Sequence, residues 1–140
     1  MARTTFPVEV LTPEGEVFSE EVEMLSTRTS VGSIGILAHH EPVLMMLEPT
    51  ELRLYRSETD VVRFAQAEGY VQVSAEGVLL LVEDAVPADK IDTAAQQEKL
   101  QRAEQELADC DEGTEGHRVA ARDKRRAEAF LAIAGGGSDR

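Results

Sequence analysis

The hydrophobic pattern of this chain changes once, at Pro87, and that change constrains the fold more than any other feature. Before Pro87, short β-branched or apolar runs, often alternating with polar residues, are separated by glycine, proline and polar turns. Such runs are typical of strands. After Pro87, the segment "ADKIDTAAQQEKLQRAEQELAD" contains no glycine or proline and is rich in strong helix formers. The sequence therefore predicts a β unit followed by helices.

Residues 1–87 predict an antiparallel β-sandwich, because no helical pattern separates the strands. In "ELRLYR", alternation places Leu52 and Leu54 on one face. The segment "EGYVQVSAEGVLLLVED" predicts a hairpin with "SAEG" as its turn. In "EEVEM", we expect Glu21 and Glu23 to point outward from one alternating strand, which makes them a solvated face rather than an acid-base pair.

Residues 88–134 predict an antiparallel hairpin of two helices, followed by a loose tail over residues 135–140. Asp89 is expected to cap the first helix, and Thr114 the second, after the glycine-containing break "DCDEGTEG". The predicted contact seam is dominated by alanine: Ile91, Ala94, Ala95, Leu100, Ala103 and Leu107 on the first helix, and Ala120, Ala127, Phe130, Leu131 and Ala134 on the second. So thin a seam fits a detachable arm, but it also fits a pair packed permanently on the sandwich.

Charge and composition exclude several classes of protein. A net charge of -13 argues against nucleic-acid binding, which needs clustered Lys and Arg. Cys110 is the single cysteine and lies among acidic residues, so neither an internal disulfide nor a reactive thiol is expected. No apolar run is long enough to cross a membrane, and no N-terminal signal pattern is visible. We therefore expect a soluble chain.

Two of the three histidines are adjacent, in the segment "GSIGILAHHEPV". Neighbouring side chains of an extended segment point to opposite faces, so His39 and His40 are poorly placed to chelate one ion. A shaped surface turn is the better interpretation. The chain also lacks the spacing of a catalytic triad, a nucleophile elbow or a P-loop, so we expect no enzyme activity and no bound metal.

Taken together, three segments resemble the epsilon subunit of F-type ATP synthase. They are "GSIGILAHHEPVL", "EGYVQVSAEGVLLLVEDA" and the helical stretch that begins "IDTAAQQ". The resemblance covers nearly the whole chain from "VEVLTPEGEVFS" onward, and the first segment is its most specific part. The alternative is a free-standing β-sandwich module that binds a protein or a small ligand.

The resemblance implies a non-catalytic central-stalk subunit, peripheral to the cytoplasmic face of the cell membrane, that couples gamma to the c-ring in proton-driven ATP synthesis. The sandwich would bind gamma and lie against the polar loops of the c-ring. The contact residues implied by position are Ser33, His40, Glu41 and Pro42. The helical hairpin would extend towards the alpha and beta subunits and restrain ATP hydrolysis.

Three positions depart from the pattern of that family. Ala38 stands where proline is usual, so the turn before His40 is expected to be less rigid. Ser33 replaces a common acidic residue, which removes the charge for an ionic contact with the c-ring. Ile91 and Asp92 match a motif through which some relatives bind ATP, but Ala95 stands where the motif has arginine. We therefore expect no cofactor, with ATP binding weak or absent.

The second predicted helix carries a basic segment, "RVAARDKRRAEAF", in which five basic and two acidic residues give a net charge of +3 (5 - 2). By the resemblance, Arg122, Arg125 and Arg126 would bind acidic residues of a beta subunit when the hairpin extends. The alternative is that these arginines are balanced by carboxylates of the first helix.

Overall fold

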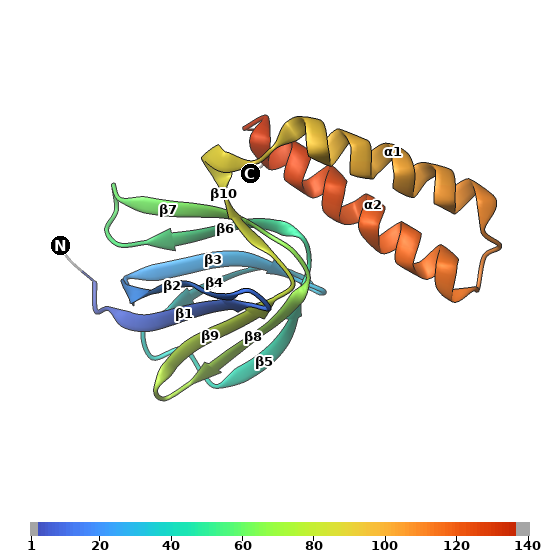
Figure 1. The fold of residues 1–140 in the computed structure, drawn as a ribbon. Coiled ribbons are helices and arrows are strands. Elements are labelled where there is room, and N and C mark those ends of the chain that lie inside the picture. Colours follow the sequence, from blue (N-terminus) through green and yellow to red (C-terminus); the bar gives the residue numbers. More distant parts are fainter. Residues whose placement is uncertain (1–2, 137–140) are drawn as a thin grey trace.

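The computed structural model describes residues 3–136, which form ten strands followed by two helices (Figure 1). The strands are β1 Phe6–Thr12, β2 Gly15–Val22, β3 Met24–Thr29, β4 Gly32–Leu37, β5 Val43–Leu47, β6 Thr50–Tyr55, β7 Val61–Gln66, β8 Gly69–Ser74, β9 Gly77–Val82 and β10 Ala85–Pro87. A short 3-10 turn, Ala88–Lys90, leads to α1 Thr93–Asp109 and α2 Glu115–Ala134.

The strands form one sheet that folds over on itself. Its order is β10-β7-β6-β3-β5-β8-β9-β1-β2, with β4 paired to β3. Strand β3 pairs with β6 through its first residues and with β5 only at Thr29, so it joins the two layers. The layers enclose one core, to which strands at opposite ends of the order contribute. The rings of Phe18 on β2 and Phe64 on β7 pack edge to face, with centroids 6.3 Å apart. The predicted sandwich is confirmed.

Most strand pairings are antiparallel, as the sequence predicts. The exception is β1, which runs parallel to β9 over Val8–Leu11 while its other edge pairs with β2. Leu52 and Leu54 point into the core, and β8 and β9 form the predicted hairpin with Ser74 opposite Gly77.

The prediction for Glu23 is wrong. Glu23 separates β2 from β3 instead of lying within one alternating strand. Its side chain is buried, and its carboxylate accepts a hydrogen bond from the backbone N–H of Arg3 at 3.2 Å. The chain turns at this residue, so alternation does not carry from one strand into the next. Glu21 is exposed, as predicted.

Both helices begin at a side-chain cap. Thr114 accepts a hydrogen bond from the N–H of His117, as predicted. The cap of α1 is Asp92, which accepts from the N–H of Ala95 at 3.1 Å, so the prediction of Asp89 is wrong. Asp89 lies in the 3-10 turn, and the extended backbone of Ile91 separates that turn from α1.

The two helices pack through small residues. Three residues of the predicted seam are buried: Ala103, Ala120 and Ala127. Gln96 is buried with them, although it is polar and was not part of the predicted seam. Ile133 was not part of the predicted seam either, and it is buried with Phe130 against the sandwich. Ala94, which was predicted to lie in the seam, is exposed.

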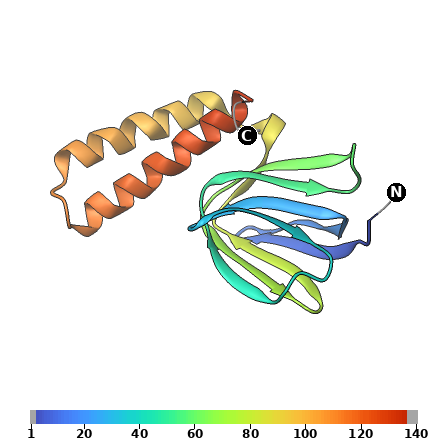
Figure 2. The same ribbon diagram turned by 180° about the vertical axis from the view of Figure 1, so that it is seen from behind.

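The hairpin contacts the sandwich through one end and extends away from it (Figures 1 and 2). Phe130 and Ile133, in the last turns of α2, pack on Ala65 and Ala67 beside the end of β7. This small apolar cluster is separate from the core of the sandwich. Of the predicted tail, Gly135 and Gly136 follow α2, and residues 137–140 lie outside the described part.

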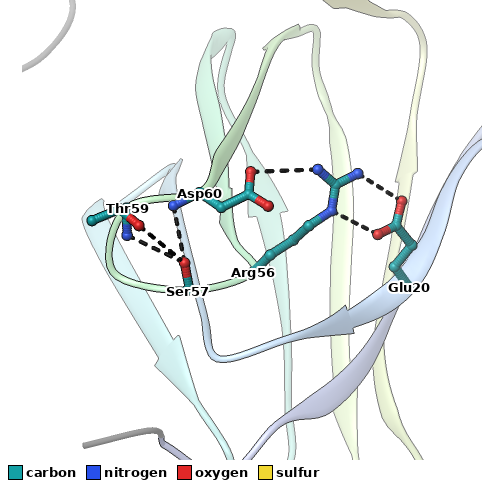
Figure 3. A network of polar contacts seen from close by, with 5 residues as sticks. All are labelled: Glu20, Arg56, Ser57, Thr59 and Asp60. Carbon is teal, nitrogen blue, oxygen red and sulfur yellow. Dashed lines mark hydrogen bonds and ion pairs between the residues drawn. The ribbon is translucent and has the colours of Figure 1, made fainter.

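An arginine clip ties edge strand β2 to the turn between β6 and β7 (Figure 3). The guanidinium of Arg56 donates to both carboxylate oxygens of Glu20, at 2.7 and 2.9 Å, and contacts Asp60 at 3.5 Å. The hydrogen bond from Arg56 lowers the pKa of Glu20, and the same bond raises the pKa of Arg56. The clip holds the two layers together at a point outside the core.

Candidate protein-protein interfaces

The segment after β4 forms a shaped turn around the two histidines. His39 has a left-handed backbone, with φ of 67°. The next residue donates twice: the N–H of His40 bonds to the carbonyl of Leu37 at 3.2 Å, and its Nδ1 donates to the carbonyl of Glu41 at 2.8 Å. Both histidines line a hollow of about 280 Å³ whose walls include Phe6 and Pro7. The turn is a fixed surface feature at the end of the sandwich.

The predicted c-ring contact residues do not form one site. His40, Glu41 and Pro42 are consecutive in the turn after β4, whereas Ser33 lies at the start of that strand. Leu37 lies four residues after Ser33 along the strand, a rise of about 13 Å, and His40 lies beyond it. Ser33 pairs with Arg28 on β3 and lines a different hollow. The two parts would therefore meet different regions of a partner.

No set of three or more His, Cys, Asp or Glu side chains within residues 3–136 could hold a metal ion. The described helices also include none that is long and apolar enough to span a bilayer.

The outer face of the sandwich carries an apolar row that the sequence analysis did not single out. Met46 on β5 lies opposite Tyr70 on β8, and Tyr70 lies opposite Leu81 on β9. These three side chains are 56%, 49% and 47% exposed. We call them, with their neighbours Leu44 and Val31, the apolar face.

The neighbours extend the apolar face in two directions. Leu44, two residues before Met46 on the same side of β5, is 67% exposed. Val31, at 89% exposure, lies in the β3–β4 turn, where the N–H of Ser30 bonds to the carbonyl of Met46. Outward positions of a solvated sheet are normally polar, so this face has the character of a protein-binding surface.

A signal for this face is present in the sequence. In an alternating strand every second residue faces water and is usually polar, as in "ELRLYR". In the runs "VLMML" and "GVLLLV" these outward positions are apolar as well. Continuous apolar runs are usual for strands that are covered on both faces.

The three arginines predicted to contact a beta subunit have different surroundings on α2. Arg125 is exposed. Arg122 is half-buried and pairs with Asp123 at 3.0 Å. Arg126 reaches the sandwich, where its guanidinium pairs with Glu68 at 2.9 Å. In this arrangement Arg126 is already occupied by a carboxylate of its own chain.

Ile91 and Asp92, which match the ATP-binding motif, both have structural contacts. Ile91 packs against the small cluster under the hairpin, and Asp92 caps α1. A hollow of about 250 Å³ lies between the helices, and its charged lining residues are Lys99, Arg102, Arg126, Asp84, Glu106 and Asp123. Three positive and three negative groups leave this lining without net charge.

Comparison with known proteins gives matches over both parts of the chain. Residues 5–88 match the family model described as the ATP synthase, Delta/Epsilon chain, beta-sandwich domain. The ATP synthase epsilon chain of Bacillus cytotoxicus is 40% identical over 106 residues, which cover 75% of this chain and 78% of the relative. That of Persephonella marina is 35% identical over 134 residues, which cover 93% and 96%.

Two solved structures share the fold. A chain of the Euglena gracilis mitochondrial ATP synthase (OSCP/F1/c-ring) superposes with a TM-score of 0.76 at 22% identity, covering 91% of this chain and 80% of the other. A chain of the Tetrahymena thermophila mitochondrial ATP synthase (central stalk/c-ring) gives 0.63 at 18% identity, covering 96% and 99%.

Proposed function

The chain belongs to the ATP synthase epsilon-chain family, and on that premise we propose that it is a non-catalytic central-stalk subunit of an F-type ATP synthase. Its sandwich binds the gamma subunit and lies against the c-ring, coupling the two in proton-driven ATP synthesis. Its helical hairpin restrains ATP hydrolysis. The subunit is held at the cytoplasmic face of the cell membrane through the complex.

The observation that carries the proposal is the apolar face. Met46, Tyr70 and Leu81 form a continuous row across three strands and are about half exposed. Isolated exposed apolar residues are ordinary, but a contiguous group on the outer face of a sheet favours a partner that removes it from water. The gamma subunit is the occupant we propose, because this face belongs to the domain that matches the family model.

Substitution within the apolar face tests this assignment. The double variant Met46→Glu, Tyr70→Glu should lose binding to an alpha-beta-gamma complex while keeping the wild-type circular dichroism spectrum. Val17→Glu is the matched control, because Val17 is also exposed (37%) but lies on edge strand β2, away from the row. Unchanged binding by the double variant, measured by surface plasmon resonance, would contradict the proposal.

We infer further that the subunit does not use ATP as a cofactor. Ala95 provides no guanidinium, and the hollow between the helices balances its three cations with the carboxylates of Asp84, Glu106 and Asp123. Those carboxylates would repel a triphosphate. Calorimetric titration of the isolated protein with Mg-ATP should show no micromolar binding, and a micromolar dissociation constant would overturn this inference.

The arginines of α2 support the inhibitory part of the proposal. Arg125 is exposed, and Arg122 pairs only with its sequence neighbour among the described ion pairs, so both can approach an acidic surface without unfolding the helix. The Persephonella marina relative aligns over 93% of this chain, so the family match extends into the helical hairpin as well as the sandwich. A free-standing sandwich module would not need that second part.

A further inference from the structure

The ion pair between Arg126 and Glu68 links the hairpin to the sandwich. Arg126 lies on α2, and Glu68 lies in the turn between β7 and β8. The Nε of Arg126 donates to Oε1 of Glu68 at 2.9 Å, and a second guanidinium nitrogen contacts the same oxygen at 2.9 Å. Only 26% of the arginine side chain and 22% of the glutamate side chain are exposed. The pair is therefore partly removed from water, and a partly buried ion pair is screened less than an exposed one.

The carboxylate of Glu68 depends on Arg126 for its counter-charge. Its second oxygen, Oε2, is buried and accepts no hydrogen bond from the described residues. If Arg126 moved away while the surroundings stayed in place, the carboxylate would remain partly buried without its counter-charge. That state is unfavourable, so leaving the sandwich requires the environment of Glu68 to open as well.

The apolar part of the same contact is confined to one end of the hairpin. Phe130 and Ile133 pack on two alanines, Ala65 and Ala67, and the remainder of the hairpin extends away from the sandwich (Figure 2). The ion pair therefore adds a charged, directional contact to an apolar contact that is confined to one end of the hairpin.

We propose that Glu68 is an intramolecular competitor for Arg126, which holds the hairpin against the sandwich and withholds this arginine from an external acidic partner. The external partner must supply carboxylates to Arg126 in exchange for Glu68. This inference rests on the proposed function only for the identity of that partner. The docking of the hairpin by Glu68 is a property of the isolated chain.

A distance measurement on the isolated protein tests the docking. Cys110, the single cysteine, follows α1 at the far end of the hairpin, and Glu58→Cys adds a second site in the exposed β6–β7 turn. Nitroxides at both positions allow electron double resonance to separate docked from undocked distances. Glu68→Gln should decrease the docked-to-undocked ratio on the order of tenfold, because a charged hydrogen-bond pair is replaced by a neutral one.

The controls separate pairing from general loss of charge or structure. Glu83→Gln removes an exposed carboxylate from the adjacent β9–β10 turn, and it should leave the ratio unchanged. The charge-swapped variant Glu68→Arg, Arg126→Glu should restore the docked distance. An unchanged ratio in Glu68→Gln, or a swapped variant that stays undocked, would overturn the proposal.

ATP hydrolysis by an alpha-beta-gamma complex separates this proposal from the function on which it rests. Glu68→Gln should inhibit at several-fold lower concentration than the wild type, since its Arg126 is free to bind the partner. If the distance measurement shows release but the variant inhibits at the same concentration as the wild type, Glu68 does not compete with the partner for Arg126, and only its docking role stands. If neither form inhibits, the inhibitory function on which the proposal rests fails. If the distances do not change, the docking role fails whatever the hydrolysis assay shows.

Discussion

At the scale of the residue, the turn around the two histidines contains a conformation that glycine would adopt more easily. His39 has φ of 67°, a region that L-residues enter at a cost of about 1–2 kcal/mol and glycine enters freely. His39→Gly should raise the free energy of unfolding by about 0.5–1 kcal/mol, after the greater entropy of glycine in the unfolded chain is subtracted. Urea denaturation measures this, with His40→Gly as the control, because His40 has no left-handed backbone. A loss of stability in His39→Gly would contradict the account of this turn.

At Gly77, in contrast, the fold requires glycine, because there is no room for a side chain. It has φ of 139°, and an added Cβ would lie 2.6 Å from the carbonyl oxygen of Pro7. Gly77→Ala should therefore destabilise the sandwich by about 2–4 kcal/mol. Gly15→Ala is the matched control, since Gly15 has a similar φ of 128° with nothing within 4 Å, and it should cost about half as much or less. Equal losses in the two variants would mean that the contact with Pro7 does not matter.

The sequence predicts single residues well only where one local pattern decides. Thr114 is a cap because a glycine-containing break precedes it and helix formers follow. Asp89 and Asp92 both precede helix formers, and the choice between them depends on the 3-10 turn, which the sequence does not reveal. Glu68 was not identified, because its partner on α2 is 58 residues away along the chain.

At the scale of the element, the Arg56 clip makes the attachment of β2 depend on pH. The pKa of Glu20 is lowered in the folded protein by the hydrogen bond from Arg56. Its stabilising effect is therefore fully present above the pKa of the unfolded state, and it is lost as pH falls through the lower folded pKa. Glu20→Gln should destabilise the protein at pH 7. The difference from the wild type should begin to shrink as pH falls below the ordinary pKa of glutamate and should vanish below the lower pKa of the folded state.

Urea denaturation at several pH values measures this difference. Glu16→Gln is the control, because Glu16 is exposed on the same strand and takes part in no described ion pair. A difference between Glu20→Gln and the wild type that persists unchanged at low pH would contradict the role of the clip.

The basic segment of α2, residues 118–130, is proposed to inhibit ATP hydrolysis. Reversing the charge of Arg122, Arg125 and Arg126 to glutamate should relieve inhibition of an alpha-beta-gamma complex, because three attractive contacts become repulsive. Binding of the triple variant to the complex should persist, since the apolar face lies on the sandwich. Full inhibition by the triple variant would show that these arginines do not take part in inhibiting ATP hydrolysis.

Element types could be predicted because each has its own period. Strand alternation placed Leu52 and Leu54 in the core, and the helical stretch after Pro87 forms α1 and α2. The apolar face could not be assigned in the same way, since an apolar outward position becomes informative only when strand register brings Met46, Tyr70 and Leu81 into one row. Likewise, Ile133 is buried because α2 docks on Ala65 and Ala67, a contact with no local pattern.

At the scale of the whole molecule, the chain consists of two parts with separate cores. The sandwich core is drawn from residues between Phe6 and Ala85, and no residue of α1 or α2 belongs to it. The hairpin adds a small cluster and an ion pair at one end of the sandwich. The sandwich should therefore remain folded, and able to bind a partner through the apolar face, without the hairpin.

The most direct test of this division compares ATP hydrolysis by an alpha-beta-gamma complex alone, with the full chain, and with a truncation that ends at Pro87. Both forms should bind, and only the full chain should inhibit. If both forms bind and neither inhibits, the protein couples gamma to the c-ring, and its hairpin does not inhibit ATP hydrolysis. If neither form binds the complex, the assignment of the sandwich to the central stalk is contradicted.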